Sequence, residues 1–312
     1  MRRYPCCTWC RAGCGLRRVW PVTWQFTEPC AGNREAMSSG RDVISRAGRE
    51  NFPVASRVLT GRYRDHLFAV YGFARHVDDI GDENDPRDRP RLLDEIDADL
   101  RRLYAGRGPR HPAVRGLTRT VRECAVPAEP FHRLVEANRR DQAVTRYETF
   151  DDLLGYCAFS ANPVGHIVLH VFGAAEAARV PLSDRVCSAL QVIEHCQDVG
   201  EDYRRGRIYL PAEDLRRYGC AERDLAGTAT PAPLRRVVAV QAAQAARLLD
   251  AGAPLLASLS GYARAAVAGY VAGGRATVAA LERSGHDVLA GTVRPRRARV
   301  AGAWLRALVT GR

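Results

Sequence analysis

The sequence contains no lysine, so its 47 basic side chains are all arginines. It also lacks any run approaching the ~20 consecutive apolar residues that a membrane-spanning helix requires. Strict alternation of apolar and polar residues, the pattern of a half-buried strand, is absent as well. We therefore expect no transmembrane segment, and the helical spacing of the apolar residues favours an all-α fold.

The formal net charge of +12 does not by itself indicate nucleic-acid binding. The arginines are spread along the chain with excesses only at its two ends. Neither end carries an aromatic RNA-binding signature or helix-turn-helix punctuation. We therefore expect no nucleic-acid partner.

Half of the ten cysteines lie near the N-terminus, at positions 6, 7, 10, 14 and 30. The other five are scattered through helical segments, which is typical of a reduced, cytoplasmic protein. No histidine with finger-like spacing follows Cys7 and Cys10, which argues against a zinc site. Residues 1–36 also lack a signal-peptide core and helical periodicity, and Met37 directly precedes the first plausible helix. We interpret residues 1–36 as an extension that does not belong to the fold.

One domain is expected over residues 37–293, which is long enough to bury a large core. Apolar spacing predicts an amphipathic helix over 90–104 with its leucines inward, and long helices over 234–259 and 262–284. Residues 294–312 form a basic tail that mixes arginines with Val300, Trp304, Leu305 and Leu308. This tail suits either an interfacial helix, which would bring the protein to the inner face of the membrane, or a packed or frayed terminal helix.

The segment from 191 to 211 contains an acidic helix face. Residues three and four apart lie above one another on a helix, and here they are Gln191, Glu194, Asp198, Glu201 and Asp202. Apolar residues upstream and downstream indicate that this helix is packed inside a bundle. Carboxylates this close together inside a bundle repel one another, so the acidic face predicts a bound cation.

The same segment suggests where its helix begins and ends. Ser183 is a suitable N-cap, and Gly206 is a suitable C-terminal cap among the arginines at 204, 205 and 207. We therefore expect one continuous helix from Ser183 to Gly206, with its arginines placed to bind an anion. His195 falls off the acidic face at one hundred degrees per residue, so we expect a packed histidine pointing away from it.

An earlier helix, from about residue 62 to the turn at 84–86, carries a second acidic face: Tyr71, Arg75, Asp78, Asp79 and Asp82. Two such runs within helices of apolar flanks are hard to explain as solvated surface. Carboxylates alone suit hard divalent cations, and magnesium is usually completed by phosphate oxygens. Two facing carboxylate helices therefore predict an open site for a diphosphate, with arginines as further anion ligands.

A helix over 150–173 is interrupted at Ala161–Gly165, because proline removes one helical donor. A break in a buried helix suggests a cavity, and metal-assisted loss of diphosphate leaves a carbocation that such a cavity must shelter. Tyr156 and Phe159 suit this task with their aromatic faces, or serve equally well as plain core residues. Asn162 either ends the helix or contacts a reacting water.

These motifs resemble the squalene/phytoene synthase family. The resemblance lies in Tyr71-x-x-x-Arg75-x-x-Asp78-Asp79-x-x-Asp82, Tyr156-Cys157 with Asn162-Pro-Val-Gly165, and Gln-Asp198-Val-Gly-Glu-Asp202-x-x-x-Gly206-Arg-Ile-Tyr209. Asn51-Phe-Pro-Val-Ala-Ser56, Ser160-Ala-Asn-Pro-Val-Gly165 and His195-Cys-Gln-Asp198 most resemble the hydroxysqualene synthase branch of bacterial hopanoid biosynthesis.

The resemblance implies an isoprenoid synthase bundle with a central acidic cavity, and two or three magnesium ions bound together with substrate diphosphate. Its candidate metal ligands are Asp78, Asp79, Asp82, Glu194, Asp198 and Asp202. Its candidate substrate-binding residues are Asn51, Tyr71, Arg75, Gln191, Arg207 and Tyr209, with Tyr156 and Asn162 as catalytic candidates. Glu194 departs from the family pattern, in which relatives usually have asparagine.

The implied reaction converts presqualene diphosphate and water to hydroxysqualene and diphosphate, without NADPH. The alternative within enzymes is head-to-head condensation of two prenyl diphosphates to presqualene diphosphate, squalene or phytoene. A different class is a catalytically silent, membrane-associated partner of sister enzymes in the pathway, with the acidic runs as relics.

Overall fold

The computed structural model describes residues 61–310, and within that range the chain forms helices joined by short loops. The first half contains α2 (Gly61–Glu83), α3 (Arg89–Tyr104), α4 (Pro112–Cys124), α5 (Ala128–Arg140), α6 (Phe150–Ser160) and α7 (Asn162–Val171). The second half contains α8 (Val180–Gln197), α9 (Val199–Arg204), α10 (Ala212–Arg217), the short 3₁₀ helix η1 (Glu222–Leu225), α11 (Ala232–Gly252), α12 (Pro254–Ser258), α13 (Gly261–Arg283) and α14 (Arg297–Thr310). The all-α prediction is confirmed for the described residues. Asn51, Met37 and the extension 1–36 lie outside them.

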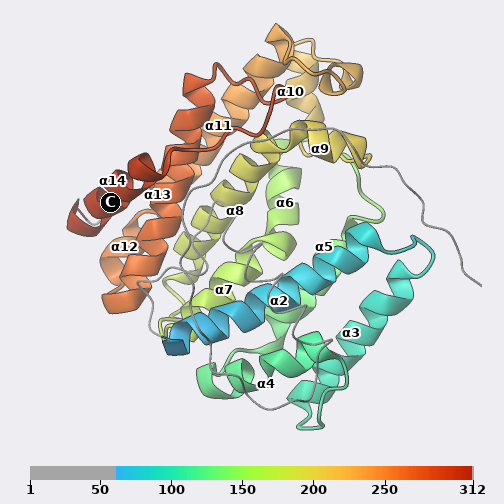
Figure 1. The fold of residues 1–312 in the computed structure, drawn as a ribbon, viewed down its shortest axis with the longest axis vertical. Coiled ribbons are helices and arrows are strands. Elements are labelled where there is room, and N and C mark those ends of the chain that lie inside the picture. The colour runs from blue at the N-terminus through green and yellow to red at the C-terminus, as the bar shows by residue number, and fades with distance from the viewer. Residues whose placement is uncertain (1–60, 311–312) are drawn as a thin grey trace, which may run out of the picture.

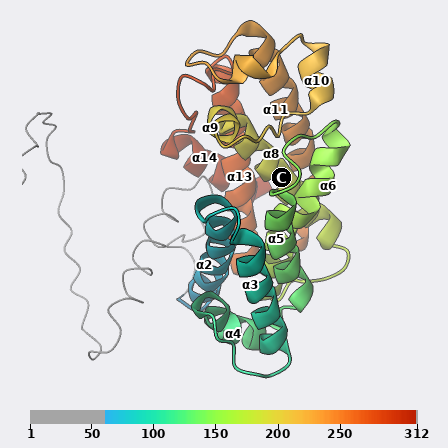
Figure 2. The same cartoon turned by 90° about the vertical axis from the view of Figure 1, so that its right-hand side faces the viewer.

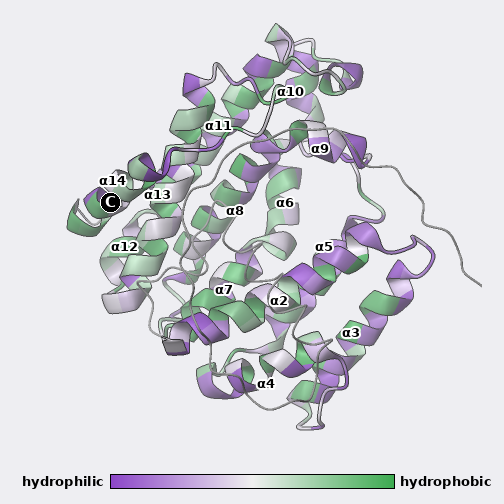
Figure 3. Ribbon diagram, viewed as in Figure 1, coloured by the Kyte–Doolittle hydropathy of each residue, from purple (hydrophilic) through white to green (hydrophobic). Residues whose placement is uncertain are grey.

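Two hydrophobic cores share the bundle. One joins α8, α11 and α13, and the other joins α2, α3, α4 and α5, with α7 contributing to both. Helix α8 runs through the middle, where α6, α7, α11 and α13 pack around it (Figure 1). In the turned view, α2, α3, α4 and α5 gather in one half of the molecule and α10 and α11 in the other (Figure 2). Apolar residues dominate α7 and α8, whereas α3 and α9 carry more polar surface (Figure 3).

The amphipathic helix expected over 90–104 is confirmed as α3. Leu93, Ile96 and Leu100 are buried, and the arginines of this helix lie on its outer side. Burying one apolar face in this way is what holds a surface helix on the bundle.

The break at Asn162–Pro163 is also confirmed. Helix α6 ends at Ser160, α7 begins at Asn162, and Pro163 lies in the first turn of α7, where its missing N–H leaves no gap in the hydrogen bonding. Gly165 follows on the face of α7 that meets α8. A Cβ there would stand 2.4 Å from Oγ of Ser183, so the glycine permits a close approach of the two helices.

The prediction of one helix from Ser183 to Gly206 is wrong in two respects. Helix α8 begins at Val180, because Pro181 suits a first turn, and Ser183 is buried inside it rather than capping it. The helix is then interrupted at Asp198, whose φ of −105° and ψ of 15° leave helical geometry, before α9 resumes. The N–H of Asp198 still donates to Glu194 O, so the chain bends without losing that bond.

The basic tail forms α14, which packs along α13. Trp304 donates its Nε1–H to the carbonyl of Ala265 at 2.8 Å, and Ala307 is buried. Of the two alternatives for this tail, packing is therefore present. No helix within residues 61–310 is both long enough and apolar enough to cross a membrane.

Candidate active site

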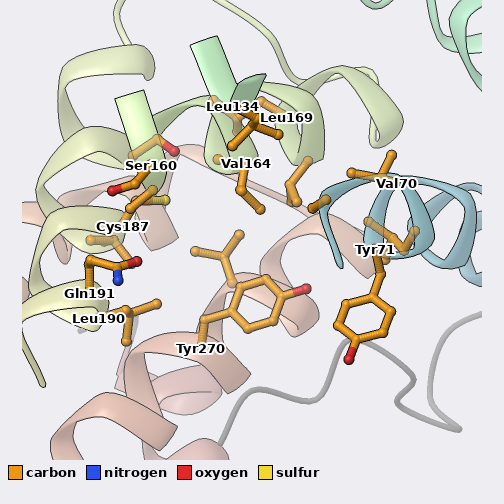
Figure 4. A pocket seen from close by; sticks show the side chains of 18 of the residues that line it. Val70, Tyr71, Leu134, Ser160, Val164, Leu169, Cys187, Leu190, Gln191 and Tyr270 are labelled. Carbon is orange, nitrogen blue, oxygen red and sulfur yellow. The ribbon is translucent and has the colours of Figure 1, made fainter. Parts of the chain in front are cut away.

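A cavity of about 320 Å³ lies between α2, α7, α8 and α13. One set of its lining residues is polar: Tyr71, Arg75, Asp78, Gln191 and Glu194. Another set is apolar and includes Leu67, Val70, Val164, Val168, Leu255 and Val267. Figure 4 shows Gln191 and Cys187 of α8 facing Tyr71 of α2 across this space.

The polar and apolar residues lie at opposite ends of the cavity. Along α2 the lining changes from Leu67 to Asp78, and along α8 it changes from Val186 to Glu194. The C-terminal ends of both helices meet, because Asp82 at the end of α2 pairs with Arg207, just beyond α9. The two acidic runs therefore border one polar end, as the expectation of facing carboxylate helices requires.

The three aspartates of the first run have different surroundings. Asp78 is open to the cavity although protein surrounds it, and this desolvation raises the pKa of its carboxyl to about 7. Asp79 pairs with Arg75 at 2.9 Å. Asp82 pairs with Arg207 at 2.8 Å and with Arg205 at 3.3 Å. Only Asp78 of the three lines the cavity.

Helix α5 fixes the position of Asp78. The buried amide of Asn138 donates to Oδ1 of Asp78 at 3.0 Å and to the carbonyl of Leu134 at 3.3 Å. One turn later, Gln142 donates to the carbonyl of Gly81 at 3.3 Å. Gly81 permits Asn138 to approach α2 this closely, because a Cβ at position 81 would lie 2.3 Å from Oδ1 of Asn138.

The second run brings several carboxylates together near the polar end. The pKa of Asp198 is raised to about 6, mainly by burial and also by the neighbouring charges of Asp202 and Glu201, whereas His195 and Arg294 oppose the shift. Glu194 lines the cavity one turn before Asp198. A cation at this position would relieve the repulsion.

His195 is correctly predicted to be packed, but the prediction that it points away from the acidic face is wrong. Its ring stacks on Tyr209 with centroids 3.8 Å apart, and its Nδ1 lies 3.7 Å from Oδ2 of Asp202. Its Nε2 lies 3.2 Å from the amide nitrogen of Gln191. The interruption at Asp198 changes the direction of the chain, so helix arithmetic from α8 does not apply to α9.

Asp141 is a site residue that the sequence analysis missed. Its carboxylate accepts hydrogen bonds from the hydroxyls of Tyr156 at 2.8 Å and Tyr209 at 3.2 Å. Burial raises the pKa of Asp141, although these bonds and the charge of Arg207 oppose the shift. Tyr209, Asp82 and Asp141 in turn outweigh burial and raise the pKa of Arg207. No periodic signal singles out Asp141, since it follows the end of α5.

Three aromatic and polar candidates lie apart from the cavity lining. Tyr156 is engaged with Asp141, and Phe159 lies under the guanidinium of Arg140, 3.5 Å from the ring centroid. Phe159 is half-buried against the hydrophobic core and does not line the cavity, which fits the alternative that it is a plain core residue. Asn162 is buried and accepts a hydrogen bond from Ser188 at 2.9 Å, which joins α7 to α8.

Tyr270 of α13 is a second residue that the sequence analysis missed. It projects into the cavity opposite Val164 and Leu190 (Figure 4). Burial raises the pKa of its hydroxyl. Its helix is rich in alanine and glycine, so its one cavity tyrosine could have been noticed as an exception to the composition.

The donor chemistry at the polar end fits magnesium. Within residues 61–310, no three histidine, cysteine or acidic side chains converge closely enough to form a metal site alone. The pKa values of Asp78 and Asp198 are raised, and Glu194 lines the cavity beside them. Side chains that offer only oxygen donors suit magnesium when other oxygens complete its coordination shell. Asp78, Glu194 and Asp198 are the residues best placed to hold such an ion, with Asp82 and Asp202 beside them.

Comparison with known proteins agrees with the geometry. Residues 45–302 match the model of the squalene/phytoene synthase family. A hydroxysqualene synthase from Zymomonas mobilis is 38% identical over 64% of this chain and 67% of its own length. Another from Rhodopseudomonas palustris is 37% identical over 68% and 72%. A chloroplastic phytoene synthase from Narcissus pseudonarcissus is 32% identical over 59% and 47%.

Solved structures share the fold. A squalene synthase from Alicyclobacillus acidocaldarius superposes with a TM-score of 0.71 and 39% identity, over 82% of this chain and 97% of the other. A dehydrosqualene synthase in complex with ligand gives a TM-score of 0.74 and 25% identity, over 88% and 96%. Both the family model and these structures extend over most of the described helices. The chain therefore belongs to the squalene/phytoene synthase family.

Proposed function

We propose that this protein is a magnesium-dependent hydroxysqualene synthase, which converts presqualene diphosphate and water to hydroxysqualene and diphosphate. The observation that carries the proposal is a cavity with carboxylates and Arg75 at one end and aliphatic walls at the other. Such a cavity suits a substrate with an anionic head and a long hydrocarbon body. The similarity to two hydroxysqualene synthases at 37% and 38% identity supports this choice within the family.

At the polar end, the carboxylates bind the metal cations and the arginines bind the anionic head of the substrate. Magnesium, when bound, supplies the positive charge that makes diphosphate a good leaving group. Arg75 and Arg207 are two of the guanidinium groups at this end. Both are held by aspartates, Asp79 and Asp82, so each is already oriented before an anion arrives. Orientation in advance reduces the cost of ordering side chains on binding.

At the apolar end, the walls protect the carbocation that remains when the carbon–oxygen bond breaks and its electron pair leaves with diphosphate. Val164, Val168 and Val267 offer no nucleophile, so they exclude unwanted reactions. The Tyr270 hydroxyl is the polar group best placed to orient one water inside this wall. That water forms the new carbon–oxygen bond and loses a proton to solvent or to the departing diphosphate.

Product analysis tests the proposal. The full chain is incubated with magnesium and either presqualene diphosphate or farnesyl diphosphate, and the lipid product is identified. We expect hydroxysqualene from presqualene diphosphate, no requirement for NADPH, and no product from Asp198→Asn at any magnesium concentration. Product from farnesyl diphosphate alone would overturn the proposal, and turnover of neither substrate would support a catalytically silent protein.

The second candidate is head-to-head condensation of two prenyl diphosphates. It is favoured by the similarity to phytoene synthases and to the dehydrosqualene synthase structure. Condensation needs room for two prenyl chains and two diphosphates at once. Supplying farnesyl diphosphate and presqualene diphosphate together distinguishes the two reactions. Only a condensing enzyme would consume the farnesyl diphosphate.

A further inference from the structure

Helix α14 has apolar residues on a packed inner face and on an exposed outer face. Its inner face packs on α13 through Trp304, Ala307 and Leu308. On its outer face, Leu305 is 61% exposed and Val309 is 84% exposed, and residues four apart lie above one another. The sequence analysis named Val300, Trp304, Leu305 and Leu308 as the apolar residues of this tail. The structure packs Trp304 and Leu308 against the bundle and leaves Leu305 exposed.

Arginines border this outer face. At 3.6 residues per turn, Arg299 and Arg306 lie at one edge of the row formed by Leu305 and Val309, and Arg297 is exposed at the first residue of the helix. All three are exposed, and within residues 61–310 no carboxylate lies at ion-pair distance from any of them. The sequence from 294 to 312 contains no acidic residue. The surface is therefore apolar along its middle, positive along the side of Arg299 and Arg306, and positive again at the first turn of the helix.

A third exposed residue joins the patch. Only four large apolar or aromatic side chains are strongly exposed in the described part of the chain, and three of them are Tyr262, Leu305 and Val309. Tyr262 lies at the start of α13, and the neighbouring Arg264 donates to the carbonyl of Leu308 at 2.8 Å. The C-terminal half of α14 thus runs beside the first turns of α13.

The patch lies at the apolar end of the cavity. Val267 of α13 and Leu255 of α12 line that end, close in sequence to Tyr262. The ring of Tyr262 also lies 5.6 Å from that of Tyr63, at the beginning of α2. Figure 1 shows α14, α12 and the beginning of α2 on the same side of the molecule. The acidic runs lie at the other end.

We propose that this face docks on an anionic lipid bilayer, with Leu305, Val309 and Tyr262 in the interface and the three arginines on headgroup phosphates. Apolar residues flanked by arginines are typical of helices that lie in a membrane surface, and tyrosine suits the headgroup level. A second copy of the chain is a poorer occupant, because a twofold contact would bring two arginine-bordered faces together. The docking brings the apolar end of the cavity next to lipid, and it does not depend on which prenyl reaction the enzyme performs.

Sedimentation of the full chain with vesicles tests the docking in the absence of substrate. We expect binding to vesicles of phosphatidylglycerol and phosphatidylcholine and little binding to phosphatidylcholine alone. The change Leu305→Glu/Val309→Glu should weaken the partition coefficient at least tenfold. Replacing the three arginines by glutamine should weaken it about a hundredfold, since each contributes about fivefold near an anionic surface. Val144→Glu is the matched control, because Val144 is also exposed (41%) but lies after α5.

A second measurement locates the contact directly. Brominated lipid should quench the fluorescence of the tryptophan introduced by Leu305→Trp, and it should not quench that of the tryptophan introduced by Val144→Trp. Equal vesicle binding by Leu305→Glu/Val309→Glu and Val144→Glu would overturn the proposal. So would equal binding to neutral and anionic vesicles, or a dimer in solution that Leu305→Glu/Val309→Glu dissociates. Thermal unfolding of each variant confirms that these exposed positions leave the fold intact.

Discussion

Gly81 is the point at which α2 most closely approaches the amide that holds Asp78. A Cβ at Gly81 would lie 2.3 Å from Oδ1 of Asn138, a separation that real contacts essentially never show. Asn138 is buried and donates to Asp78 at 3.0 Å and to Leu134 at 3.3 Å. The change Gly81→Ala must therefore displace Asn138 and release Asp78.

Two opposing effects determine how much Gly81→Ala changes the free energy of unfolding. Alanine is a better helix former than glycine by about 1 kcal/mol. Loss of a hydrogen bond to a carboxylate costs about 1.5–3 kcal/mol. We expect Gly81→Ala to lower the free energy of unfolding by about 0.5–2 kcal/mol, which lowers Tm by about 1–8 °C for a domain of this size. Gly72, on the same helix, has nothing within 4 Å of its Cβ position. Gly72→Ala should therefore raise Tm by about 2–4 °C.

Thermal unfolding of the two variants measures this difference. The double variant Gly81→Ala/Asn138→Ala removes the clash, so its Tm should be no lower than that of Asn138→Ala alone. Gly81→Ala should also weaken the response of activity to magnesium, because Asp78 loses its fixed position. A rise in Tm for Gly81→Ala equal to that for Gly72→Ala would refute the reasoning, since Asn138 would then move without cost.

Three further predictions concern the polar end and the cavity wall. Glu194→Asn should lower magnesium affinity while retaining turnover at saturating metal, because a neutral oxygen replaces a charged one; equal affinity in an activity titration would remove Glu194 from the ligands. Arg207→Gln should destabilise the protein by about 2 kcal/mol in denaturant titrations, because it leaves the half-buried Asp82 with a weaker partner. Arg205→Gln should change stability by less than about 1 kcal/mol, since Arg205 is 48% exposed, and equal effects would contradict this ranking. Tyr270→Phe should leave Tm unchanged within about 1 °C but slow hydroxysqualene formation about three- to tenfold, the value of one neutral hydrogen bond; an unchanged rate would exclude the hydroxyl from orienting water.

The sequence by itself determined the all-α class, most of the helices and the two acidic runs. Local spacing is enough for this, because a helix needs only its own apolar stripe and its own turn residues. Leu93, Ile96 and Leu100 are buried as their spacing predicts, and the break before Pro163 follows from its missing N–H. Asp78 and Asp198 were identified for the same reason, since crowded carboxylates within apolar flanks are unusual in a sequence.

Only the tertiary structure decided which partners the charged side chains have. Asp82 lies far from Arg207 in the sequence, yet the two pair at 2.8 Å because α2 and the turn after α9 end at the same place. Asp141, Tyr156 and Tyr209 meet in the same way. The interruption at Asp198 brought His195 to Asp202, and the packing of α13 against α8 brought Tyr270 into the cavity. Helix periodicity fixes the face on which a side chain lies, but the packing of whole helices fixes what that face meets.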